Sequence, residues 1–148
     1  MNLGDIVRRN AKRYPRKTGV TFGSVTLSFD EFNRRVNSAA NTLIDLGMRR
    51  GDRIGIILDN CHQYVELYFA VAKAGGIAVP VNTGLTVQEM AYILSNAEIT
   101  ILVFGENFAP IVDSLLKELG SLKATIVVDD SMENGNSYEQ LVAQYPHT

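Results

Sequence analysis

The sequence predicts an α/β fold, in which a mostly parallel sheet is built from successive βαβ units behind an N-terminal β-hairpin. Four short apolar strands begin near residues 53, 77, 99 and 124 and alternate with helical patterns. This alternation is typical of parallel sheets whose strands are joined by crossover helices. Between Val20 and Phe29, two runs alternate apolar with small or polar residues around Gly23-Ser24, which favours a type II′ hairpin turn.

Length and composition fit a single unit with a real core. The chain has 148 residues, of which 46% are apolar, so it is not a disordered polypeptide. Its start lacks the apolar segment of a secretory signal, and we expect no transmembrane segment, because no apolar run is long enough. A lone cysteine, Cys61, allows no internal disulfide and fits a reducing, cytoplasmic setting.

The net charge of −2 conceals an uneven distribution. Residues 1–58 hold 11 Lys/Arg and 5 Asp/Glu, whereas residues 59–148 hold 3 and 11. No nucleic-acid-binding signature accompanies the basic half, so we expect no nucleic-acid partner and interpret the bases as a solvated face. A peripheral membrane-docking face is the sharper alternative, and its bases would be Arg8, Arg9, Lys12 and Arg13.

Helical periodicity begins at the N-terminus. Leu3, Ile6, Val7 and Tyr14 fall on one stripe, which predicts a short helix docked on the domain and ended by Pro15. A longer amphipathic helix follows the hairpin. Its apolar positions recur at steps of three and four, and they are Phe32, Val36, Ala39, Leu43 and Leu46, with Gly47 as the residue after the helix.

The βαβ units follow in order. Arg53–Leu58 is too apolar to be a half-exposed strand. Asn60 is placed to cap a helix that runs to about Ala74, and this helix is apolar nearly all round, so we expect it to be well buried. The remaining predicted elements are a strand at Gly76–Val81, a helix capped by Thr86 and Glu89, a strand at Ile99–Phe104, a helix around Ala109–Leu119, a strand at Ala124–Val128, a polar loop at Asp129–Ser137 and a short helix opened by Ser137 and Gln140.

The residues alone indicate no active site. Neither nucleotide-binding glycine motif is present, and Gly75-Gly76 precede a strand, so they are interpreted as a helix cap and tight turn. No Cys or His lies at metal-ligand spacing, so no metal site is predicted. Cys61-His62 resembles a nucleophile and base, but neighbours on a helix point apart, although a helix start could depress the thiol pKa. Asp129-Asp130 could bind a cation, and a solvated loop is the preferred interpretation.

Two boxes of sequence resemble the opening of adenylate-forming ligases, a superfamily of acyl-CoA synthetases, luciferases and peptide-synthetase adenylation domains. The first box has the pattern "[LT]-[ST]-[YF]-x-E-[LF]", followed after a long helix by "G-D-R". Its matching positions are Leu27, Ser28, Phe29, Glu31, Gly51 and Asp52. The second box has the pattern "K-A-G-[AG]-x-x-x-P-[LVI]-[ND]". Its matching positions are Lys73, Ala74, Gly75, Gly76, Pro80 and Asn82, and all these motif positions except Asn82 are given structural roles.

The resemblance covers nearly the whole chain and implies that residues 1–148 are the N-terminal segment of an AMP-forming acyl-CoA synthetase. It implies a parent enzyme that uses ATP, Mg and CoA on a carboxylic acid, with a fatty acid as one candidate. The family's phosphate loop and catalytic Lys lie downstream of the matched region. We therefore expect a scaffold with no catalytic residue, no second complete domain and no tightly bound cofactor, inactive by itself.

Ligands of α/β folds bind beyond the carboxyl ends of parallel strands. That rule gives four candidate cleft-lining residues, which are Asn82, Thr83, Gly84 and Leu85. CoA-using relatives often have a base where Gly84 stands, so a CoA phosphate contact there is in doubt. A strand edge left open predicts a homodimer or a swapped assembly. The alternative function is a stand-alone, non-catalytic binding or interaction module on the same scaffold.

Overall fold

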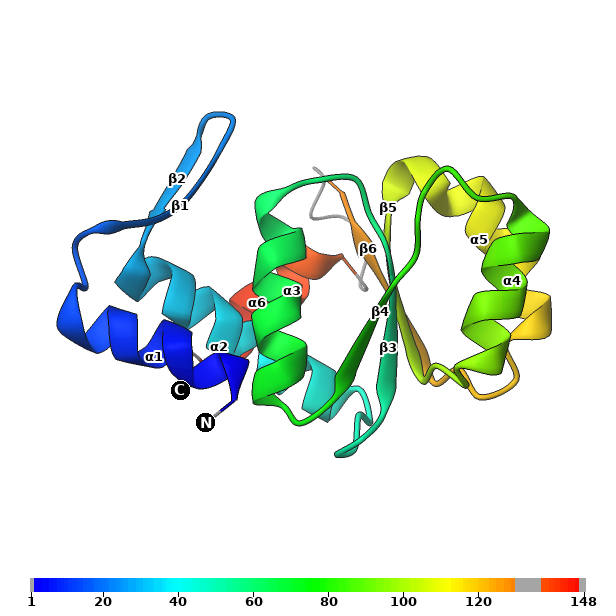
Figure 1. The fold of residues 1–148 in the computed structure, drawn as a ribbon, viewed down its shortest axis with the longest axis horizontal. Helices are drawn as coiled ribbons and strands as arrows, with labels where there is room; N and C mark the ends of the chain where they lie inside the picture. The colour runs from blue at the N-terminus through cyan, green and yellow to red at the C-terminus, as the bar shows by residue number, and fades with distance from the viewer. Residues whose placement is uncertain (1, 130–136, 147–148) are drawn as a thin grey trace.

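The computed structural model describes residues 2–129 and 137–146, which form one three-layered unit (Figure 1). Its strands are β1 (Thr18–Phe22), β2 (Val25–Ser28), β3 (Arg53–Ile57), β4 (Ile77–Pro80), β5 (Ile101–Gly105) and β6 (Ala124–Val128). Its helices are α1 (Leu3–Arg13), α2 (Phe29–Asp45), α3 (His62–Lys73), α4 (Val87–Asn96), α5 (Ala109–Leu115) and α6 (Tyr138–Gln144).

The predicted fold class is confirmed. β3, β4, β5 and β6 form a parallel sheet in the order β4-β3-β5-β6, and β1 and β2 form a separate antiparallel hairpin. The pairing of Phe22 with Val25 leaves Gly23 and Ser24 as the turn. Gly23 has a φ of 57°, whereas Ser24 is not among the non-glycine residues with positive φ, and this combination is that of a type II′ turn.

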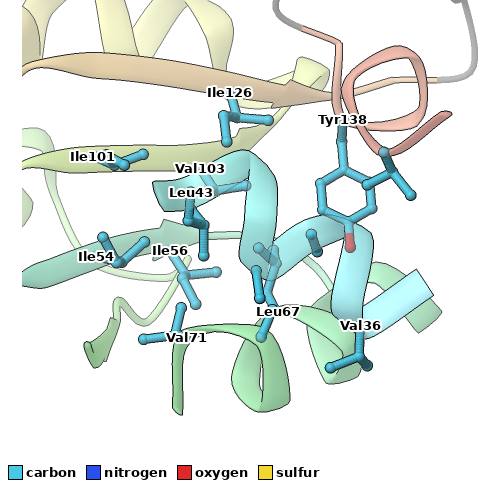
Figure 2. Close-up of a cluster of buried hydrophobic side chains, with 14 of the residues drawn as sticks. Val36, Leu43, Ile54, Ile56, Leu67, Val71, Ile101, Val103, Ile126 and Tyr138 are labelled. Carbon is cyan, nitrogen blue, oxygen red and sulfur yellow. The ribbon is translucent and has the colours of Figure 1, made fainter. Parts of the chain in front are cut away.

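Helices cover both faces of the sheet, and each face has its own core. α2, α3 and α6 lie over one face, where Ile54, Ile56 and Ile101 are fully buried (Figure 2), and α1 packs outside them on α2 and α3 (Figure 1). α4 and α5 lie over the other face, on Ile57 and Leu102. Burial of each such aliphatic side chain contributes about 1.5–3 kcal/mol, so the two cores hold the sheet between its helices.

Two helices begin where their capping boxes predict. Ser28 Oγ accepts from the backbone N–H of Glu31 at 3.1 Å, and the Glu31 carboxylate accepts from the Ser28 N–H at 2.8 Å. Thr86 and Glu89 repeat this exchange before α4. Ser137 precedes α6 without capping it, and its hydroxyl donates to Asp129.

α1 is docked on the domain as predicted, but only part of the predicted stripe faces inward. Leu3, Ile6 and Tyr14 are exposed, and of that stripe only Val7 is buried. The helix packs instead through Gly4, Val7 and Ala11. A Cβ on Gly4 would lie 2.8 Å from the Cβ of Lys73, so the small residue lets α1 approach α3 closely.

The prediction for α3 also needs correction. Cys61, not Asn60, is its N-cap, and Cys61 makes no side-chain cap. Val65 and Tyr68 are exposed, so the helix is not buried all round. Its fully buried side chains include a carboxylate, Glu66, at 0% exposure. The number of apolar residues in a helix does not distinguish a helix that is buried on all sides from one with an exposed apolar face.

Three further elements were less fully specified by the sequence. The strand predicted after Gly75-Gly76 is β4, which lies at the edge of the sheet with Ile77 exposed. The helix expected around Ala109–Leu119 consists of α5 and a short 3-10 turn, Leu116–Glu118, in which Leu116 is exposed. Most of the predicted polar loop lies outside the described residues.

The Arg35 network, composed of Arg35, Glu66, Glu139, Tyr138 and His62, joins α2, α3 and α6. The Arg35 guanidinium donates to Glu66 Oε2 at 2.7 Å and to Glu139 Oε1 at 2.6 Å. Tyr138 Oη donates to Glu66 at 3.0 Å, and His62 Nδ1 lies 3.1 Å from the same carboxylate. Burial alone would raise the pKa of Glu66, but the hydrogen bonds and charge of His62 and Arg35 lower it overall.

Two glycine turns lie side by side at the amino edge of the sheet, where β3 and β4 begin. The N–H of Gly51 donates to the carbonyl of Gly75 at 2.8 Å, and the N–H of Ile77 donates to the carbonyl of Asp52 at 2.8 Å. Gly51 has a φ of 87° and Gly75 a φ of 84°, which is left-handed backbone that favours glycine. The two turns therefore fix each other through their backbones.

Replacing Glu66 tests the Arg35 network through pH. A lowered folded-state pKa adds stability above the unfolded value of about 4.3, and this stability disappears as the pH falls through the folded value. Glu66→Gln should therefore cost about 3 kcal/mol at pH 7, and this cost should shrink as the pH falls below about 4.3. Urea unfolding at several pH values measures this, with exposed Glu118→Gln as the control. An unchanged pH slope in Glu66→Gln would contradict the assignment.

Replacing Gly75 tests the paired turns. Gly75→Ala forces a Cβ into the left-handed region, with Arg50 Cγ 3.3 Å away, and should lower the free energy of unfolding by about 1–2 kcal/mol. Gly120→Ala is the matched control, because an added Cβ meets nothing within 4 Å there. Equal free energies of unfolding for the two variants, measured in urea, would show that the turn carries no such constraint.

Candidate functional site

The motif positions Leu27, Ser28, Phe29 and Glu31 lie where the hairpin meets α2. Leu27 packs against the core, and Ser28 and Glu31 form the helix cap. The ring of Phe29 would lie 3.0 Å from a Cβ on Gly19, so it fills the space that the glycine leaves. This part of the first box builds a helix start and presents no reactive group.

Gly51, Asp52 and Ala74–Gly76 form the paired turns at the amino edge. Asp52 Oδ2 accepts from the Arg49 N–H at 2.8 Å and closes the first turn, and Ala74 is the C-cap of α3. Gly76 lies against Met48 and the Asp52 carbonyl, where a Cβ would be 3.0–3.1 Å from both. Ligands of parallel sheets bind at the opposite edge, so a structural role for these five positions stays the prediction.

Lys73 is the base of the second box, and it is held inside the helical layer. Its ammonium donates to the side-chain carbonyls of Asn33, at 3.3 Å, and Asn37. Burial, followed by the nearby charge of Arg8, lowers its pKa. Lys73 thus joins α3 to α2.

The predicted cleft-lining residues form a compact turn after β4. Pro80 ends the edge strand, where its missing N–H costs no ladder bond. Asn82 Oδ1 accepts from the N–H of Gly84 at 2.8 Å, and the N–H of Leu85 donates to the Asn82 carbonyl. Leu85 lines a hollow of about 420 Å³ on α4, with Gln88, Glu89, Tyr92 and Ile93. Whether Asn82, Thr83, Gly84 and Leu85 contact a ligand remains a prediction.

The carboxyl ends of β3 and β5 form a second candidate position that sequence reasoning missed. The helix after β3, α3, lies on one face of the sheet, and the helix after β5, α5, lies on the other. The neighbouring strands β3 and β5 therefore form the topological switch point of the sheet. Ligands of doubly wound sheets bind at such a switch. The groups there are Asp59, Glu106 and Asn107, and Asn107 Nδ2 donates to Asp59 at 3.1 Å. Only the strand order, which one sequence does not reveal, could have identified them.

The Cys61-His62 pair is not a catalytic dyad. His62 Nδ1 lies against Glu66, within the Arg35 network. Burial raises the pKa of the Cys61 thiol, which outweighs backbone hydrogen bonds that act to lower it. The expected possibility of a depressed thiol pKa at this helix start is therefore wrong.

Asp129-Asp130, the candidate cation site, lies only partly within the described residues. Asp129 is buried and accepts from Ser137 Oγ at 2.8 Å, and Asp130 lies outside the described residues. Across residues 2–129 and 137–146, no three His, Cys, Asp or Glu side chains are placed to hold a metal ion. Within the same ranges, no helix combines the length and apolar character needed to span a bilayer.

An apolar groove of about 520 Å³ opens beside the carboxyl end of β3. It lies between α1, the hairpin and α3, and its residues, which define the apolar groove below, are Leu3, Phe22, Asn60, Cys61, Tyr64, Val65, Tyr68 and Phe69. Burial and the neighbouring Tyr68 raise the pKa of Tyr64 to about 12. Sequence reasoning missed this groove because it assigned these side chains of α3 to the core.

Comparisons with known proteins agree on one family. A family model described as AMP-binding enzyme matches residues 7–147. Among curated proteins, the crotonobetaine/carnitine–CoA ligase of Escherichia coli O17:K52:H18 is 34% identical over 125 residues. That match covers 82% of this chain but 24% of the relative, so the chain spans about a quarter of its length.

Solved structures extend the likeness to the whole fold. An anthranilate CoA ligase in complex with anthranoyl-AMP superposes with a TM-score of 0.93 at 28% identity, covering 100% of this chain and 29% of that one. A fatty acyl CoA synthetase of Mycobacterium tuberculosis gives 0.90 at 26%, covering 99% and 29%. Since the family model spans nearly every residue and the fold agrees, this chain belongs to the AMP-binding enzyme family of adenylate-forming ligases.

Proposed function

We propose that this chain is the N-terminal segment of an ATP-dependent, AMP-forming acid–CoA ligase, called the parent ligase below. The observation that carries the proposal is the match over residues 7–147 to a family whose similar members are CoA ligases several times longer. In the parent ligase, ATP and a carboxylate would give an acyl-adenylate and pyrophosphate, and the thiol of CoA would then displace AMP.

Within the parent ligase, residues 1–148 would act as scaffold. The motif positions hold helix starts and turns, and Lys73 is tied to Asn33 and Asn37. At the carboxyl edge, the groups nearest the switch are the acids Asp59 and Glu106, and an acidic edge repels phosphate. The described residues therefore do not fit the phosphates of ATP or CoA by themselves, no three His, Cys, Asp or Glu side chains among them are placed to hold Mg, and no catalytic step is assigned to them.

The substrate is proposed to be a carboxylic acid, and a fatty acid is the candidate we favour. The fatty acyl CoA synthetase of M. tuberculosis supports this choice, since its fold matches this chain at a TM-score of 0.90. The anthranilate CoA ligase matches as well, with a TM-score of 0.93, and its printed substrate is an aromatic acid. Residues 82–85 would then form part of the cleft wall on the acyl or CoA side, in a cytoplasmic enzyme.

A stand-alone interaction module is the second candidate function. The feature that favours it is the completeness of the packing in these residues, which bury two separate cores without further polypeptide. The mass of the native gene product, detected with an antibody against this segment, separates the two. A species much larger than 16.3 kDa supports the parent ligase, and a species of that mass supports the module.

The purified 148-residue chain should not catalyse acid-dependent exchange of pyrophosphate into ATP. The reason is that the family's phosphate loop and catalytic Lys are expected downstream of these residues, while Lys73, the one base of the second box, is hydrogen-bonded to Asn33 and Asn37. The exchange of labelled pyrophosphate, measured with fatty and aromatic acids, tests this, and the parent ligase is the positive control. Exchange by the chain alone would contradict the scaffold role.

The isolated chain should also self-associate as a homodimer or swapped assembly. β4 is an edge strand with no neighbour on one side among the described elements, and unpaired strand edges invite pairing. The strand is short and ends in Pro80, so we expect weak association that grows with concentration. Light scattering over a concentration series measures the association. A constant monomer mass at high concentration would show that this edge does not pair with a second chain.

A further inference from the structure

The apolar groove is an exposed apolar surface that the motif positions do not explain. Leu3 is 54% exposed, Phe22 45%, Val65 40% and Tyr68 38%, and all four line the same hollow. They come from α1, the hairpin and α3, so the patch is continuous across three elements. Folded monomers rarely leave a contiguous apolar patch open without a binding partner.

The lining of the groove has the chemistry of a protein interface. None of its eight residues is charged, and Tyr64 and Tyr68 are stacked with ring centroids 5.3 Å apart. Cores of protein interfaces are rich in aromatic side chains and poor in charge. A phosphate or carboxylate ligand would find no cation there, and the bases that could bind anionic lipid, Arg9, Lys12 and Arg13, line a different hollow around Ile6.

The hairpin gives an independent indication that the groove is covered. β1 and β2 pair only with each other and extend away from the body of the molecule (Figure 1). Their base is anchored by Val20 and Leu27, but Phe22 beside the turn is exposed and lines the groove. A two-stranded hairpin is at best marginally stable in water unless it packs against something else. A segment that fills the groove would cover this exposed end as well.

The comparisons indicate which partner is available. The chain covers 24% of the similar E. coli ligase and 29% of the anthranilate CoA ligase, so a parent ligase of that size would hold most of its polypeptide after these residues. We propose, on the basis of the proposed function, that an apolar segment of the parent ligase downstream of residue 148 docks in the apolar groove. The groove is then an internal interface of the parent ligase and is open only when the segment is absent.

Substitutions on α3 and α4 test the proposal with matched chemistry. Tyr68→Lys places a charge in the groove, whereas Tyr92→Lys makes the same change at a residue that is 73% exposed on the opposite face. In the parent ligase, Tyr68→Lys should lower the melting temperature by roughly 3 °C or more, and Tyr92→Lys should not. In the 148-residue chain Tyr68→Lys removes only the stacking with Tyr64, so its effect there should be much smaller than in the parent ligase, and this difference excludes simple misfolding.

Cys61 gives a second readout without any engineered group, because it lines the groove and is the single cysteine of these residues. A neutral maleimide, followed by peptide mass spectrometry, should modify Cys61 at least about tenfold more slowly in the parent ligase than in the chain. Equal rates, together with a neutral Tyr68→Lys in the parent ligase, would overturn the docking proposal.

The remaining outcomes separate the two levels of the proposal. A large native species in which Cys61 reacts as fast as in the isolated chain and Tyr68→Lys is neutral would leave the proposed function standing and remove the docking segment. A native species of 16.3 kDa would remove the parent ligase, and the docking segment with it. Protection of Cys61 only in dimers of the isolated chain, released by Tyr68→Lys, would identify a second copy as the occupant and would also overturn the proposal.

Discussion

The buried carboxylate of Glu66 is the constraint on which the helical layer depends. At 0% exposure it is stable only because Arg35, Tyr138 and His62 surround it with donors. These partners come from three helices, so a single ionised side chain, Glu66, links α2, α3 and α6 over the sheet. An apolar core of the same volume would hold the helices together, but it would tolerate sliding that a carboxylate with directed hydrogen bonds does not.

Most of the fold could be predicted because its signals are local. The capping residues Ser28 and Thr86 and the glycine turns act within a few positions, and the alternation of apolar strands with helices indicates a parallel sheet. Arg35 and Glu66 could not be paired from the sequence, since their contact depends on how α2 crosses α3. The open face of α3 was missed for a related reason: Val65 and Tyr68 are as apolar as core residues, and only packing shows which side each faces.

The two edges of the parallel sheet carry different kinds of residue. The residues that reveal the family lie at the amino edge and at the start of α2, where backbone geometry demands them. The carboxyl edge carries acids and amides of Asp59, Glu106 and Asn107. These motif residues therefore identify the family without identifying a reactive group. They specify the turns that precede β3 and β4.

The hydrogen bond from Gly51 to Gly75 has a consequence for how the sequence can vary in length. Both ends of the β3–α3–β4 crossover are anchored at one edge, so the intervening residues form a closed loop of fixed length. One inserted residue in α3 would turn everything after it by about 100° around the helix axis and carry Glu66 or Lys73 away from its partners. Insertions and deletions should therefore accumulate in the connections around α4 and α5 and be rare between the two glycines.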